Sequence, residues 1–219
     1  MSEADKSGTI GLAWTGASGI QYGLRLLECL LHAGRPVALM ISRPAQVVIG
    51  METDLDLPGR TGEIERVLTE RHGAAPGQLR VYGREQWTAP LASGSAAPAA
   101  MVVCPCTTAT VSAVATGASR SLIERAADVV LKEQRKLVLV VRETPLSAIH
   151  LENMLTLARA GAVIMPAAPG FYHRPARVGE LVDFIVARVL DQLGIEHELV
   201  TPWGSDRKAA PAVVATKGA

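Results

Sequence analysis

The stretch KLVLVVRETPLSAIHLENMLTLARAGAVIMPA, residues 136–167, decides the fold of this chain. It opens with an apolar run, 136–142, whose length and valine and leucine content indicate a buried strand. Helical periodicity follows over about 147–160, and Gly161 stands where a helix takes its C-terminal cap. A second apolar run, 162–167, ends the stretch. The pattern therefore predicts a strand, a helix and a second strand parallel to the first.

The same alternation continues along the rest of the chain. Further strands are expected at 9–16, 36–42, 79–83 and 100–106, and helices at about 18–32, directly after 42, at 63–73, after 106, at 121–134 and at 178–194. The segment 84–99 is rich in Pro, Ser and Gly and indicates a loop. Apolar strands between helices form a parallel sheet covered on both faces. We therefore expect a single-domain α/β fold with a doubly wound, mostly parallel sheet, Rossmann-like or flavodoxin-like.

Composition limits the class of protein. The 219 residues are 48% hydrophobic with a formal net charge of +1, which suits one sizeable core and argues against nucleic acid or an anionic membrane as the main partner. Three cysteines without framework spacing indicate a reducing compartment. The first residues are polar, and no apolar run reaches the roughly 18 residues of a membrane span. A soluble, cytoplasmic domain over 9–203 is expected, between a flexible N-terminus (1–8) and a flexible tail (204–219).

Parallel sheets of this kind bind ligands at the carboxyl ends of their strands, so the residues there are the first candidates. The turn Gly16-Ala17-Ser18-Gly19 follows the first strand. Its small residues and the helix start behind it suit a phosphate, whereas a plain turn with Ser18 as the helix N-cap fits equally well. For Ser42, after the second strand, the N-cap interpretation is favoured.

Later strand ends also carry polar chemistry. Cys104-Pro105-Cys106 lacks the spacing of a metal or redox site, and Cys104 is interpreted as a buried structural cysteine. The threonines that follow suit a pocket for a polar ring or phosphate. Arg142 and Glu143 end the fifth strand as an ion pair or as a site acid beside an anion-binding arginine. Arg188, at the edge of the last helix's apolar face, is either a snorkelling side chain or a phosphate contact.

These segments, in this order, resemble the flavin prenyltransferase (UbiX) family. The matching stretches are TGASGIQYGLRLL, ISRPAQ, WTAPLASGS, MVVCPCTTATVSAVATGAS, LIERAADVVLKE, LVLVVRETPLS, IHLENM and PAAPGFYHRP, which lie between residue 9 and about residue 203. GASG alone is a weak signal, but RETPLS with IHLENM and GFYHRP is specific. The turn CTTAT stands where relatives often have serine, which keeps the hydroxyl chemistry.

The resemblance implies an enzyme that binds FMN, forms a homododecamer and moves a dimethylallyl group from dimethylallyl monophosphate to reduced FMN. The product, prenylated FMN, would serve a partner UbiD-type decarboxylase, for example in ubiquinone biosynthesis. No metal is expected, and the chain lacks the D-D-x-x-D clusters that hold magnesium in diphosphate-using prenyl enzymes.

The resemblance also assigns roles to individual residues. The flavin site would comprise Gly16, Ala17, Ser18, Ser42, Cys106, Thr107, Thr108 and Arg125. The substrate phosphate would be held by Lys132, Arg142, Tyr172 and Arg188, some from neighbouring subunits. Glu143 would be the acid/base near the departing phosphate, and Trp87 would wall the prenyl pocket. With Ser18 they form the expected catalytic group, and Trp203 would help close the pocket.

Three other functions compete with this one. The nearest is an FMN-dependent decarboxylase of the same fold acting on a peptidyl cysteine or a pantothenate derivative, whose relatives carry PASANT-like and PxMN-like stretches. Here the corresponding places read CPCTTAT and PAAPGF. A direct phenolic-acid decarboxylase would release carbon dioxide without a partner. A flavin-binding scaffold without chemistry could lack Glu143, Lys132 and Tyr172, which are all present.

Overall fold

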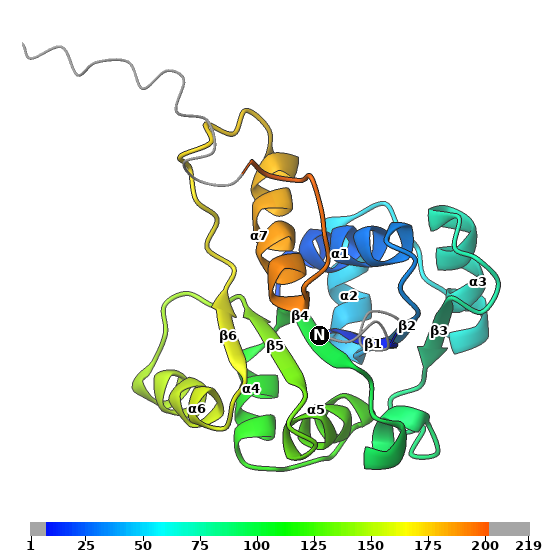
Figure 1. The fold of residues 1–219 in the computed structure, drawn as a ribbon, viewed down its shortest axis with the longest axis vertical. Coiled ribbons are helices and arrows are strands. Elements are labelled where there is room, and N and C mark those ends of the chain that lie inside the picture. The colour runs from blue at the N-terminus through cyan, green and yellow to red at the C-terminus, as the bar shows by residue number, and fades with distance from the viewer. Residues whose placement is uncertain (1–7, 202–219) are drawn as a thin grey trace, which may run out of the picture.

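In the computed structural model, which describes residues 8–201, six strands form one sheet (Figure 1). The strands are β1 (Ile10–Trp14), β2 (Val37–Ile41), β3 (Leu79–Tyr82), β4 (Ala100–Cys106), β5 (Lys136–Val141) and β6 (Val163–Pro166). They lie in the order β3-β2-β1-β4-β5-β6, and every neighbouring pair is parallel. The doubly wound parallel sheet is confirmed, and its order is the Rossmann-type order.

Helices connect these strands at the positions that the periodicity predicts. They are α1 (Ile20–His32), α2 (Arg43–Glu52), α3 (Thr61–His72), α4 (Thr108–Ala115), α5 (Leu122–Lys132), α6 (Ala148–Arg159) and α7 (Val178–Leu193), with short 3₁₀ turns η2 (Pro90–Ala92) and η3 (Gly94–Ala96). The Ser147 side chain caps α6, and Gly161 follows that helix in the left-handed region with φ 98. The predicted glycine stop is therefore confirmed.

The sheet separates two hydrophobic cores, because successive side chains of a strand point to opposite faces. Figure 1 shows α1, α2 and α7 on one side of the sheet and α4, α5 and α6 on the other. Along β1, Leu12 and Trp14 belong to the first core and Ala13 to the second. Because all strands are parallel, their carboxyl ends lie at one edge of the sheet, where the site residues were expected.

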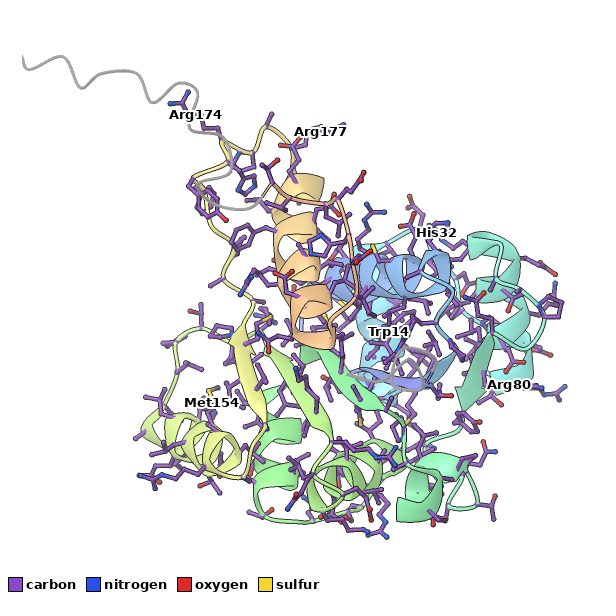
Figure 2. The ribbon with its side chains drawn as sticks, in the orientation of Figure 1. Trp14, His32, Arg80, Met154, Arg174 and Arg177 are labelled. Atoms are coloured by element: carbon purple, nitrogen blue, oxygen red, sulfur yellow. The ribbon has the colours of Figure 1, made fainter. Side chains whose placement is uncertain are left out.

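Trp14 anchors the end of β1 inside the first core, as Figure 2 shows. Helix α1 reaches it through Gly23, where an added Cβ would lie 2.7 Å from the indole Nε1 of Trp14. Only glycine permits this approach, since real Cβ atoms do not come so close. The close approach of Gly23 to Trp14 thus holds α1 directly against the end of β1.

The structure differs from the sequence prediction in two details. Helix α1 begins at Ile20 rather than at residue 18, and the segment 84–99 contains two 3₁₀ turns within the predicted loop. Trp203, the tail 204–219 and nearly all of the N-terminal segment lie outside the described residues. None of the helices within 8–201 is both long and apolar enough to cross a membrane.

Candidate functional site

β1 and β4 are neighbours at the point where the strand order of the sheet reverses. Thr15 joins the carboxyl ends of these two strands. Its hydroxyl donates to the Pro105 carbonyl over 2.8 Å and accepts the Thr107 N–H over 2.9 Å. Thr15 is 3% exposed, and its bond to Pro105 is buried while its bond to Thr107 is partly buried. Sheets of this order bind ligands in the crevice at this point. Thr15 thus fixes the spacing of the two turns that flank the crevice, a role that the sequence analysis missed.

The start of α1 is held by a carboxylate from another helix. Its N-cap is Gly19, with no side-chain cap, and Oε2 of Glu52 accepts the N–H groups of Gly19 (2.8 Å) and Ile20 (3.2 Å). A negative group is favourable at this end of a helix because the helix dipole is positive there. The suggested N-cap role of Ser18 is therefore wrong, since Ser18 precedes the cap. Its side chain is exposed instead.

Arg142 brings the turn after β5 to the same place. Its Nε donates to the Ser18 carbonyl over 3.1 Å, although the two residues lie 124 positions apart. Partial burial raises the pKa of Glu52, but the Ser18 hydroxyl, the two helix amides and the Arg142 charge outweigh it, and the pKa lies below its ordinary value. Ser18, Glu52 and Arg142 therefore form one charged cluster at the carboxyl edge of the sheet.

A cavity of about 180 Å³ opens at the same carboxyl edge of the sheet. Hydroxyl and charged side chains from the ends of β1, β2 and β3 and from α4 and α5 surround it, and its lining includes Thr15, Ser42, Arg43, Arg84, Thr110, Ser121 and the carboxylate of Glu124. Ser42 caps α2 by accepting the Ala45 N–H over 3.1 Å, so its N-cap interpretation is confirmed while it also faces the cavity. Hydroxyls beside two arginines form a suitable environment for a phosphate.

The turn after β4 contributes hydroxyls rather than thiols. Cys104 and Cys106 are fully buried, and burial raises the pKa of both thiols, with the neighbouring Cys106 raising that of Cys104 further. The structural interpretation of Cys104 is confirmed. Cys106 as a whole has no exposed surface in one chain either, and its carbonyl accepts the Arg142 N–H. Thr107 caps α4 by accepting the Thr110 N–H, and Thr108 begins that helix.

The turn after β1 suits a flavin phosphate for two reasons. Among residues 8–201, the backbone N–H groups of Gly16, Ala17 and Ser18 donate no hydrogen bond to another protein group. Successive free amides of this kind form an anion-binding concavity. Glycine is required at position 16 by packing, since a Cβ there would lie 2.3 Å from Pro44 Cβ. The close contact with Pro44 holds the free amides next to the cavity that Ser42 lines.

Three further expected residues have separate surroundings. Glu143 directly follows Arg142 and is exposed, with its Oε1 accepting the Thr144 N–H over 3.1 Å. Trp87 lies in the segment after β3 and is 49% exposed. In α5, the Arg125 guanidinium donates to the Ala92 carbonyl over 3.1 Å and pairs with Asp128. No described contact joins any of these three side chains to the Ser18 cluster.

The expected phosphate ligands lie in three different places on one chain. Arg142 is at the carboxyl edge of the sheet, whereas Lys132 ends α5, shortly before β5 begins, and therefore lies at the amino edge. Its Nζ contacts Glu133 and approaches Gly94. Tyr172 and Arg188 line a cavity of about 450 Å³ beside α7. One chain by itself brings together only part of the predicted phosphate site.

No metal site accompanies these residues in the part of the chain that the structure describes. Within residues 8–201, no three His, Cys, Asp or Glu side chains are placed so that they could hold an ion. The polar groups at the strand ends are mostly hydroxyls, amides and arginines, which bind anions.

Comparison with known proteins assigns the family. The family model described as Flavoprotein matches residues 1–190. A flavin prenyltransferase UbiX of Pseudomonas aeruginosa is 61% identical over 195 residues, which cover 89% of this chain and 93% of the relative. The chain belongs to the UbiX flavin prenyltransferase family.

Solved structures of UbiX proteins agree with this assignment. A structure described as AnUbiX (PadA1) in complex with FMN and dimethylallyl pyrophosphate is 38% identical, with a TM-score of 0.80 over 90% of this chain and 97% of that one. A dodecameric FMN-dependent UbiX-like decarboxylase from Escherichia coli O157:H7 is also 38% identical, with a TM-score of 0.76 over 86% and 96%. The predicted fold and family are confirmed.

Several residues of this candidate site were missed by the sequence analysis. Glu52 lies in the last turn of α2, far from any strand end, so no pattern linked it to Ser18. Arg43 and Arg84, by contrast, follow the ends of β2 and β3 within two residues. The rule that placed Ser42 and Arg142 at the carboxyl edge could also have found these two arginines.

Proposed function

We propose that this chain is a flavin prenyltransferase that moves a dimethylallyl group from dimethylallyl monophosphate to reduced FMN. The observation that carries the proposal is that one edge of the sheet holds both the cluster of Ser18, Glu52 and Arg142 and the hydroxyl-lined cavity, in a chain of the UbiX family. Reduced FMN would supply the nucleophilic ring atoms that accept the prenyl group.

The phosphate end of FMN would occupy the cavity between the first two strand ends. The free amides of Gly16 to Ser18 and the hydroxyls of Ser42 and Thr107 would bind it, with Thr108 and Arg125 nearby. Cavities for whole drug-sized ligands measure about 300–1,000 Å³. The cavity of about 180 Å³ suits the phosphate and part of the ribityl chain, and the ring system would extend beyond it.

Cations and an aromatic face would stabilise the separating charges. As the allylic C–O bond breaks, the phosphate gains negative charge that Arg142, Lys132, Arg188 and the Tyr172 hydroxyl would neutralise without a metal. The allylic cation would gain about 0.5–2 kcal/mol from the Trp87 ring. Glu143 would then exchange a proton near the departing phosphate.

The assembly and the partner belong to the same proposal. A homododecamer would allow neighbouring copies to supply Lys132, Tyr172 and Arg188, and the relative from Escherichia coli is described as dodecameric. The prenylated flavin would be used by a UbiD-type decarboxylase in the cytoplasm, with ubiquinone biosynthesis as one setting. Trp203 would help to close the pocket.

The test is an anaerobic incubation of the purified protein with reduced FMN and dimethylallyl monophosphate, followed by mass spectrometry of the extracted flavin. A flavin heavier by one five-carbon prenyl unit is expected, and an unmodified flavin beside intact donor contradicts the proposal. A parallel incubation with the diphosphate, the donor bound by the solved relative, measures donor choice. The Glu143→Gln variant should keep FMN bound but form product about 100-fold more slowly, because general acid–base catalysis is lost.

A second candidate function is direct decarboxylation, since the relative from Escherichia coli is described as a decarboxylase. It predicts that the purified protein alone releases carbon dioxide from a phenolic acid. The prenyltransferase predicts release only after the prenylated flavin has been passed to a UbiD-type partner.

A further inference from the structure

The cavity beside α7 is lined by a series of side-chain contacts that has no role in the proposed reaction. After α7 the chain turns back along the helix, as Figure 1 shows, and a cavity of about 450 Å³ lies between them. Tyr172 and Arg188 line it, and so do Asp191 and His197. Two of the four expected phosphate ligands therefore share one cavity with a carboxylate and an imidazole.

Asp191 links Arg188 to His197. Its Oδ2 accepts a hydrogen bond from Nη1 of Arg188, and its Oδ1 lies 3.1 Å from Nε2 of His197. The His197 side chain is only 14% exposed, whereas the Arg188 side chain is 54% exposed. The mostly buried His197 thus anchors the Asp191 carboxylate, and the carboxylate in turn holds the more exposed guanidinium of Arg188.

This arrangement leaves the guanidinium free to bind an anion. Arg188 carries five N–H donors, and the contact with Asp191 uses Nη1. Within residues 8–201 the remaining donors meet no other protein acceptor. A long arginine side chain loses about 2 kcal/mol of rotamer entropy when it is fixed. A guanidinium already held in place binds phosphate with a smaller entropic cost.

We propose that Asp191 and His197 are positioning residues for the prenyl phosphate, acting through Arg188. The inference rests on the proposed function, in which Arg188 contacts that phosphate. Asp191 orients the guanidinium, and His197 holds Asp191 through its Nε2. The pair thereby specifies a phosphate monoester or diphosphate as the group that enters this cavity.

The test measures binding without turnover. Isothermal titration of dimethylallyl monophosphate into full-length protein loaded with oxidised FMN gives a Kd in the absence of transfer. Asp191→Ala and His197→Ala are each expected to raise this Kd by about fivefold to tenfold, and Arg188→Ala by at least as much. The Kd for FMN and the melting temperature should stay unchanged. In the reduced enzyme, Asp191→Ala and His197→Ala should raise KM for the donor and lower kcat, each by no more than Arg188→Ala does.

Two comparisons separate positioning from a general structural effect. Adding Asp191→Ala to Arg188→Ala should cause no further loss, because Asp191 acts only through Arg188. His197→Gln should restore binding, since its amide can donate to Asp191. The matched control is Glu180→Ala, which removes the same kind of contact, a carboxylate three residues after an arginine, from Arg177, the residue before α7. This change also removes the acceptor of the Ala176 N–H. Figure 2 shows Arg177 next to the start of α7, whereas Arg188 lies in the second half of that helix, and no change in the Kd for the donor is expected.

The opposite results overturn the inference. Tighter binding by Asp191→Ala would mean that the carboxylate repels the phosphate, and additive losses in the double variant would mean that it acts independently of Arg188. If the wild type forms prenylated flavin but Asp191→Ala and His197→Ala leave the Kd for the donor unchanged, the positioning role alone is overturned. A wild-type chain that neither binds the donor nor prenylates FMN overturns the proposed function and this inference together.

Discussion

Glu52 is the residue that connects the local chemistry of the site to the stability of the fold. It satisfies two amides at the start of α1 that would otherwise lack a partner, and it does so from the end of α2. The charge of Arg142 favours the same ionised state. A helix start, a helix end and a strand end thus depend on one carboxylate.

We expect Glu52→Gln to lower the stability of the protein at pH 7 by about 1 kcal/mol, the scale of a charge at a helix terminus. The pKa of Glu52 is lower in the folded chain than its ordinary value of 4.5, so its contribution is present above that pH and is lost as pH falls through the folded pKa. Urea unfolding at pH 7 and pH 4 measures this difference, which should shrink at the lower pH. Glu70→Gln, which removes an exposed pair with Arg66, is the control and should show little change at either pH.

Ser18 separates ligand binding from folding, because it does not cap α1. Ser18→Ala should weaken FMN binding by roughly fivefold, about 1 kcal/mol for one hydrogen bond, without lowering the melting temperature. Ser147→Ala is the matched control, since Ser147 does cap a helix. It should cost about 1 kcal/mol of stability and leave FMN binding unchanged. Fluorescence titration of FMN and thermal unfolding give both values, and equal losses of both in Ser18→Ala would contradict the assignment.

At the scale of elements, the site depends on how β1 and β4 are held together. Strand pairing places the two ends side by side, and Thr15 fixes the turns beyond them through Pro105 and Thr107. Neither turn could keep its place by local propensity alone, because each is a short connection without regular structure. The hydroxyl of one buried threonine supplies the missing contacts.

Thr15→Val should therefore destabilise the chain by about 1–3 kcal/mol, since the buried Pro105 carbonyl loses its donor and the partly buried Thr107 N–H loses its acceptor. FMN binding should weaken as well, because the turn that carries the flavin hydroxyls is no longer fixed. Thr156→Val removes a hydroxyl contact on the exposed side of α6 and should cost about 0.5 kcal/mol or less. Urea unfolding and FMN titration of both variants compare the two positions, and similar losses would contradict the special role of Thr15.

At the scale of the whole molecule, the distribution of cations indicates sites shared between copies. Arg142 lies at the carboxyl edge of the sheet and Lys132 at the amino edge of the same chain. The length of the sheet separates them, so both can contact one phosphate only if different copies supply them. Closed symmetric assemblies place identical surfaces in such contact repeatedly.

Complementation tests this arrangement. Lys132→Ala and Arg142→Ala homo-oligomers should each be nearly inactive, whereas co-expressed chains that assemble together should recover about a quarter of the wild-type rate, the random share of sites with both residues intact. Sedimentation should give twelve copies of the 23.1 kDa chain for every sample. Mixed assemblies without recovered activity would place both residues in the same chain's site.

The periodicity of the chain predicted most of the fold because each strand and helix has its own apolar pattern. The runs at 100–106 and 136–142 have no other stable burial than the centre of a parallel sheet, and both occur in the structure as β4 and β5. The start of α1 was misplaced because Ser18 and Gly19 are both acceptable caps in sequence, and the choice depended on Glu52.

By itself, the sequence determined the doubly wound sheet, the family and the set of strand ends that carry polar chemistry. These follow from local pattern, since hydrophobic period and turn residues act over a few positions. Only the tertiary structure decided which side chains meet. Glu52 caps α1, Thr15 joins two turns, and Asp191 holds Arg188 against His197 because packing brings distant segments within hydrogen-bond distance. Such contacts depend on three-dimensional distance, which no spacing along the chain encodes.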